Sequence, residues 1–130
     1  MKLSAFLAIT GVLAILFGIF FLVAPSTALS QYGVPVEPHN QMQARYYGGA
    51  LLQMGIVAWL ARATQDAIAS RAILIGLAVG NAVGIALGVW AGTAGLQSAM
   101  VWSSVLTFGV LLAGCVYFLM SRQPSASRAG

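Results

Sequence analysis

Few side chains in this chain of 130 residues could carry out chemistry. It has six Lys and Arg residues, two carboxylates (Glu37 and Asp66) and one histidine, His39. A long apolar stretch separates the two carboxylates, so they do not form the close pair that acid–base catalysis uses. One histidine and one cysteine, Cys115, are too few for a protein-ligated metal or haem. We therefore predict no catalytic residue, no metal, no cofactor and no enzymatic activity.

A polar cluster lies at the start of the second apolar stretch. Gln41 and Arg45 are four residues apart and share one face if the segment is helical. Glu37 can fold back to pair with Arg45. One interpretation is interfacial anchoring with a surface ion pair, and the other is an anion or lipid-headgroup site with Arg45 as the charge. The candidates for such a site are Glu37, His39, Gln41, Arg45, Tyr46 and Tyr47.

Three further polar residues lie near the middle of apolar stretches: Gln53, Asn81 and Thr107. If neighbouring stretches are antiparallel helices, these residues share one depth. We expect a hydrogen bond between Gln53 and Asn81, of the kind that contributes about 0.6–2 kcal/mol in membranes. Its role is either to set the helix register or to provide a polar point inside a lipid- or quinone-sized cavity.

A ladder of glycines recurs at every fourth position in the third apolar stretch, and alanines recur two residues out of step. On a helix the glycines form one smooth groove and the alanines a second groove on the opposite side. Small residues let membrane helices approach closely, so we predict helix packing on two sides. Alternatively, the glycines clear space for a flat or chain-like ligand. The ladder consists of Gly76, Gly80, Gly84, Gly88 and Gly92.

Composition identifies the setting of these residues. Hydrophobic residues make up 60% of the chain and charged residues 6%, whereas about a quarter of an ordinary soluble domain is charged. We predict an all-α fold, an antiparallel bundle of four transmembrane helices in one domain, 1–120. The run after Lys2 is longer than the hydrophobic part of a signal peptide, so we predict a retained helix. The expected spans are about 3–24, 41–62, 70–91 and 96–120, with a proline-rich loop at 26–39 and a disordered cytoplasmic tail at 121–130.

Basic residues predict the orientation of this bundle. Five of the six would flank the spans on one side and only Arg45 on the other, which predicts cytoplasmic N- and C-termini. The net charge of +4 then reflects topology, and we expect no nucleic-acid partner. Short connections put the third span between the second and the fourth. The apolar stretches hold none of the Asp, Glu or His residues that proton-coupled transporters place in the membrane.

Several short motifs carry a family resemblance: Ala24-Pro25, Tyr32-Gly33, and Ala44-Arg45-Tyr46-Tyr47-Gly48-Gly49 followed by Gly55 and Trp59. With these motifs the chain resembles small four-span bacterial membrane proteins of unknown function, which implies a four-helix bundle. The start of the second span is more loosely similar to the DoxX-like family, some of whose members are linked to quinone-dependent sulfur oxidation. That resemblance implies a quinone-linked role.

The expected function follows from these observations. We predict a non-catalytic, multi-pass protein of a bacterial inner membrane, a structural or accessory subunit that packs with lipids, other membrane subunits or itself. One alternative is a small carrier or binder of an amphipathic molecule, such as a lipid or a quinone. The other alternative is an accessory to a quinone-linked oxidoreductase.

Overall fold

The computed structural model describes residues 2–96 and 98–129, with side chains up to residue 121. This part of the chain is all-helical and contains no strand. Four helices are long and one is short. They are α1 (Leu3–Val23), α2 (Pro25–Gln31), α3 (Pro38–Ala61), α4 (Ala67–Thr93) and α5 (Ala99–Ala129).

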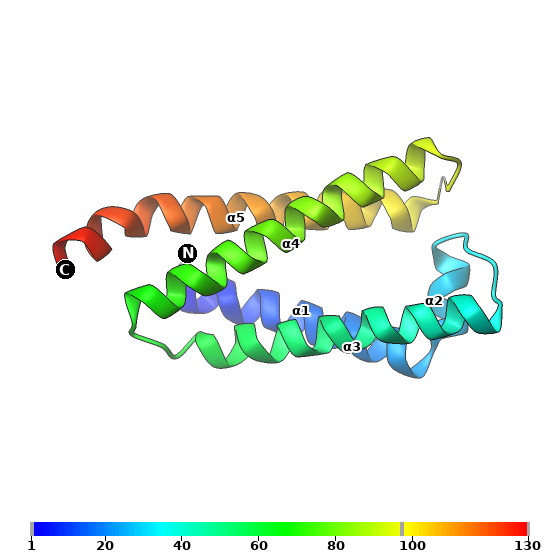
Figure 1. Ribbon diagram of the computed structural model, residues 1–130, viewed down its shortest axis with the longest axis horizontal. Helices are drawn as coiled ribbons and strands as arrows, with labels where there is room; N and C mark the ends of the chain where they lie inside the picture. Colours follow the sequence, from blue (N-terminus) through cyan, green and yellow to red (C-terminus); the bar gives the residue numbers. More distant parts are fainter. Residues whose placement is uncertain (1, 97, 130) are drawn as a thin grey trace.

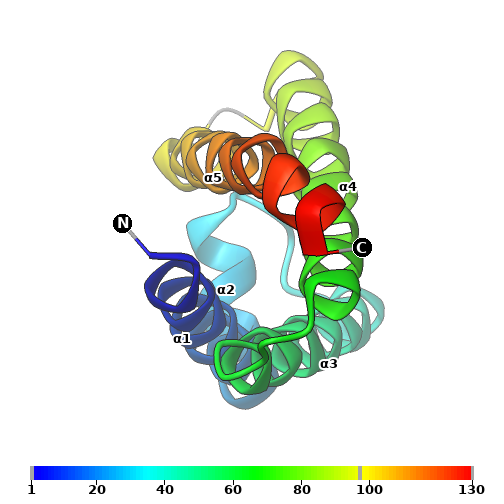
Figure 2. The same ribbon diagram turned by 90° about the vertical axis from the view of Figure 1, so that its left-hand side faces the viewer.

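The long helices form two antiparallel hairpins. Most contacts between helices lie within the pairs α1–α3 and α4–α5. Both chain ends lie at the end of the molecule where α3 turns into α4, and α2 lies at the opposite end (Figure 1). Viewed along their length, α1 and α3 lie on one side of the molecule and α5 on the other, with α4 leading from α3 to α5 (Figure 2).

Three helices are long and apolar enough to cross a membrane: α1, α4 and residues Ala99–Ser121 of α5. The predicted count of four is therefore too high by this criterion, and the exception is α3. This helix has 24 residues, which is a sufficient length, but it is not apolar enough. Its first turns are polar, and both Arg45 and Gln53 interrupt its apolar sequence.

The backbones of α1 and α3 come close together at two pairs of glycines. A Cβ atom added to Gly18 would lie 2.8 Å from the Gly48 carbonyl oxygen, and one added to Gly48 would lie 2.7 Å from that of Gly18. Gly11 and Gly55 face each other in the same reciprocal way, at 2.9 and 2.8 Å. Glycines seven residues apart on each helix therefore bring the two backbones together.

The glycine ladder of α4 divides into two parts. Added Cβ atoms at Gly84 and Gly88 would meet Phe108 and Val105 of α5 at 2.8 and 2.5 Å, and Gly92 is covered by the Trp102 ring. At Gly76 and Gly80 they would meet nothing within 4 Å. One side of α4 is thus packed on α5. We expected the other side of α4 to pack against α3. The structure has little contact between these two helices, because α4 leaves α3 after the turn and crosses toward α5 (Figure 1).

The apolar core lies toward the end with the two termini. It draws residues from all four long helices, including Leu7 of α1, Ala61 of α3, Leu74 of α4 and Cys115 of α5. A second, smaller cluster joins Phe21 and Ala44 to Ala28 and Leu29 of α2. The hairpins are therefore closed on each other at one end and separated at the other.

Several helix ends differ from the expected ones. The loop at 26–39 contains α2, since Pro25 occupies the first helical position, where its missing N–H is not needed. At α4, the Asp66 carboxylate caps the helix by accepting from the N–H groups of Ile68 and Ala69. The backbone of α5 continues as a helix to Ala129, where we expected a disordered tail from 121.

Candidate ligand cavity

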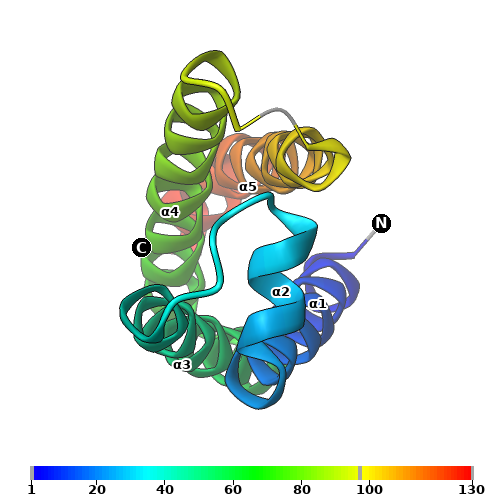
Figure 3. The ribbon, with the colours of Figure 1, turned by 90° about the vertical axis from the view of Figure 1, so that its right-hand side faces the viewer.

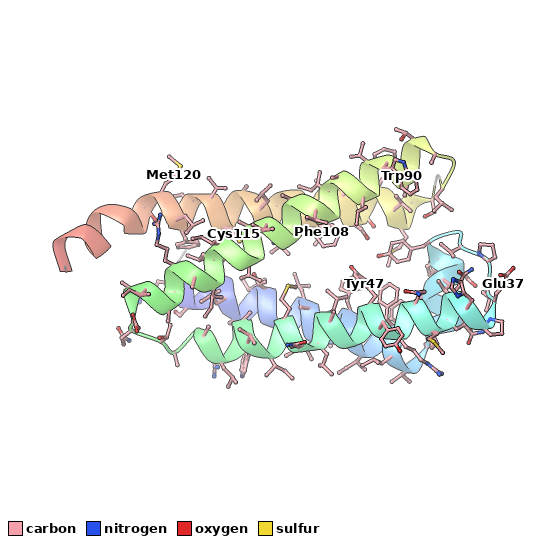
Figure 4. The ribbon with its side chains drawn as sticks, in the orientation of Figure 1. Glu37, Tyr47, Trp90, Phe108, Cys115 and Met120 are labelled. Atoms are coloured by element: carbon pink, nitrogen blue, oxygen red, sulfur yellow. The ribbon has the colours of Figure 1, made fainter. Side chains whose placement is uncertain are left out.

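A cavity of about 590 Å³ lies between the two hairpins, on the side of the molecule that contains α2. Pockets of about 300–1,000 Å³ are typical of small-molecule sites. Figure 4 shows Tyr47 of α3 and Phe108 of α5 on the inner sides of the hairpins, with Glu37, Trp90 and Met120 at the periphery. Every helix contributes to the lining of this cavity.

The glycine ladder helps to create the space. Gly80, Gly84 and Gly88 line the cavity along α4. Gly80 is open, with no heavy atom within 4 Å of an added Cβ, so a side chain there would project into free volume. Gly84 and Gly88 both pack on α5 and line the cavity, whereas Gly80 lines it without a packing partner.

The lining of this cavity is uncharged. Among the residues of known position around it there is no Asp, Glu, Lys, Arg or His. A charged group is costly to bury without a partner, so the cavity favours a neutral molecule with a large apolar part. The polar residues of the lining are Tyr32, Asn40, Gln43, Tyr47, Asn81 and Ser104.

Helix α2 lies across one end of the molecule, between the α1–α3 and α4–α5 hairpins (Figure 3). Its last turn leads to Tyr32, whose hydroxyl shares a 2.6 Å hydrogen bond with Ser104 Oγ of α5. The Phe21 ring lies between two tyrosines, at 5.8 Å from Tyr32 and, edge-on, at 4.9 Å from Tyr47. The bond between Tyr32 and Ser104 joins the two hairpins across the end of the cavity.

A smaller pocket of about 70 Å³ adjoins the main cavity, and Asn81, Tyr47 and Phe108 line both. It also contacts Thr10 of α1 and Thr107 of α5. Two of the three polar residues expected near mid-membrane, Asn81 and Thr107, thus surround one pocket. The pocket lies beside the middle turns of α1, α4 and α5.

The expected hydrogen bond between Gln53 and Asn81 is not formed. Asn81 is 4% exposed, and its Nδ2 donates to the Leu77 carbonyl oxygen of its own helix at 2.7 Å. Gln53 is exposed and lines neither cavity. The reason is the rotation of α3: Gly55 faces α1, and a residue two positions earlier is turned by about 200° from it.

Of the expected polar cluster, only Tyr47 lines the cavity. Its other members lie outside both linings. Glu37, His39, Arg45 and Tyr46 are exposed, Gln41 is half-buried, and the expected ion pair between Glu37 and Arg45 is not formed. Asn40 and Gln43, which we did not single out, lie in the lining instead. Gln43 and Tyr47 follow Asn40 by three and seven residues, so the three side chains share one face of the helix. This spacing is the signal that would have identified the face.

No family model, no curated protein and no solved structure matches this chain. The residues that the structure describes contain no group of three or more His, Cys, Asp and Glu side chains able to hold a metal. The class of protein therefore rests on its own features. It is an all-helical protein with three helices suited to cross a membrane and an uncharged cavity between two hairpins.

Proposed function

We propose that α3 is the fourth span of a bacterial inner-membrane protein with both termini in the cytoplasm. The glycine contacts with α1 support this, because they fix α3 alongside a helix that is itself suited to cross the membrane. Arg62 lies over the Trp59 ring, 3.8 Å from its centroid, as expected of a residue pair at the interface. Orientation follows the excess of Lys and Arg beside the termini and the α3–α4 turn.

We infer that this protein binds a neutral amphipathic molecule, a lipid or a quinone, between its two hairpins and catalyses no reaction on it. The observation that carries the proposal is the cavity of about 590 Å³ lined without a charged side chain. Apolar side chains such as Val83, Leu87 and Met54 suit an acyl or isoprenoid tail. If the occupant is a quinone, the DoxX-like resemblance favours an accessory role beside a quinone-linked oxidoreductase.

The test is a pair of matched substitutions on α4. Gly80→Leu places a side chain in the open cavity, whereas Gly76→Leu makes the same change one turn earlier, at an open position outside the lining. Each variant would be purified in mild detergent and its extract analysed by mass spectrometry for lipids and quinones. We expect one neutral species to accompany the wild type and Gly76→Leu and to be depleted at least about fivefold in Gly80→Leu. Equal content in all three proteins would contradict the proposal.

A second candidate function, a subunit that packs with another membrane helix, is favoured by the outer face of α3. Gln53 presents its amide there, and Gly49 nearby has nothing within 4 Å of an added Cβ. An amide facing lipid is costly, and a neighbouring helix that offers a hydrogen bond removes that cost. A second copy or another subunit that co-purifies in mild detergent and is lost on Gln53→Leu would support this function.

A further inference from the structure

We propose that the pocket of about 70 Å³ beside Thr10 receives the polar head of the bound molecule and that this head presents a carbonyl oxygen. The inference rests on the proposed function and adds the chemical class of the ligand and the direction in which it lies. The main cavity would hold the tail. The small pocket lies beside the middle turns of the helices. The other polar region contains Asn40 and Gln43 and lines the main cavity at the start of α3.

Thr10 is the residue that points to a ligand. It is 1% exposed, and its Oγ1 has no hydrogen-bond partner among the described residues. Buried hydroxyls are normally paired, and a threonine within a helix can bond a carbonyl of its preceding turn. Leaving a buried polar group without a partner is unfavourable. A ligand atom in the adjoining pocket can supply the missing partner.

The hydrogen bonds already made around the pocket show which donors are left over. Thr107 and Ser103 already donate their hydroxyl protons to the carbonyl oxygens of Ser103 and Met100, at 2.9 and 3.0 Å. Thr10 keeps an O–H to donate, and Asn81 keeps the second hydrogen of an amide that uses one on Leu77. One ligand acceptor can satisfy both of these unused donors, because a carbonyl oxygen accepts two hydrogen bonds.

This chemistry has two sources in a membrane. An isoprenoid quinone carries ring carbonyls, and a diacylglycerol carries ester carbonyls, and both are neutral with long apolar tails. A phospholipid does not fit as well, because its phosphate would lie near an uncharged lining. We therefore expect neutral carbonyl lipids to bind in preference to anionic ones.

The experiment compares binding of three probes to the purified full chain by native mass spectrometry. Decylubiquinone and dioleoylglycerol carry carbonyls, and dodecylbenzene carries none. Thr10→Val removes the hydroxyl at nearly constant volume, and Thr10→Ser retains it. Thr93→Val is the matched control, because this threonine lies outside both cavities and already donates to the Trp90 carbonyl.

We expect Thr10→Val to weaken binding of at least one carbonyl probe about 2- to 12-fold, the value of one hydrogen bond. Dodecylbenzene should bind Thr10→Val as it binds the wild type, and Thr10→Ser and Thr93→Val should bind all probes normally. Comparison of the two carbonyl probes identifies the source. Unchanged binding of both by Thr10→Val would overturn the inference, with water as the partner of Thr10, and leave the proposed function standing. If no probe binds the wild type, both fail.

Discussion

The contact between α1 and α3 allows a quantitative prediction for Gly48→Ala. The new Cβ would lie 2.7 Å from the Gly18 carbonyl oxygen and 2.9 Å from Phe21 Cβ, whereas ordinary contacts begin at 3.4 Å. The helices must separate locally by about 0.7 Å, the difference between the two distances. Overpacking of this kind costs about 1–3 kcal/mol. The atoms that the new Cβ would contact belong to the backbone or, in Phe21, are bonded directly to it, so no side-chain rotation relieves the clash.

Gly49→Ala is the matched control for this prediction. Gly49 is the next residue on the same helix, and an added Cβ meets nothing within 4 Å. Both substitutions bring the same gain in helix propensity, about 0.8–1 kcal/mol. The difference between the two variants therefore isolates the helix contact.

The assay is unfolding by sodium dodecyl sulfate in mixed micelles, followed by circular dichroism, with the free energy of unfolding as the readout. We expect Gly48→Ala to be about 1–3 kcal/mol less stable than Gly49→Ala. The double variant with Gly18→Ala should lose less than the two single losses together, because both changes open the same contact. Equal stability of Gly48→Ala and Gly49→Ala would refute the assigned packing of these helices.

Two further predictions concern the helix ends. Asp66→Ala removes the acceptor that Ile68 N–H uses at 2.9 Å and should cost about 1 kcal/mol of unfolding free energy; the loss should be absent in Gln65→Ala. Tyr32→Phe breaks the hydrogen bond to Ser104 and should speed amide exchange in α2 about 2- to 12-fold, while Tyr46→Phe leaves it unchanged. Normal exchange in Tyr32→Phe would mean that this bond does not hold α2 in place.

Much of the helical architecture could be predicted from the sequence. The first span was expected at 3–24 and the helix occupies Leu3–Val23; the third was expected at 70–91 and lies within Ala67–Thr93. Hydropathy and length are properties of each segment alone, so they can be interpreted without knowledge of its neighbours. The short helix α2 could not be predicted, because the three prolines at 25, 35 and 38 favour a loop over a helix.

The pairing of the helices could not be predicted in the same way. The most regular glycine pattern is in α4, yet the close backbone contacts are formed by Gly11 and Gly18 with Gly48 and Gly55. Each of those pairs has the same seven-residue spacing, which is a visible signal once the segments are compared. Which helix a groove packs against depends on the rotation of both helices about their axes. The same rotation turns Gln53 outward and separates it from Asn81.

A helical chain that is poor in charge and rich in segments suited to a membrane could be predicted from composition, because these properties depend on one segment at a time. The cavity could not be predicted in this way: the hairpins meet at one end and part at the other, and a Thr10 hydroxyl without a partner among the described residues lies beside the opening. A cavity depends on the angle between two packed pairs of helices. That angle is set by contacts between residues far apart in the chain, and no single segment contains it.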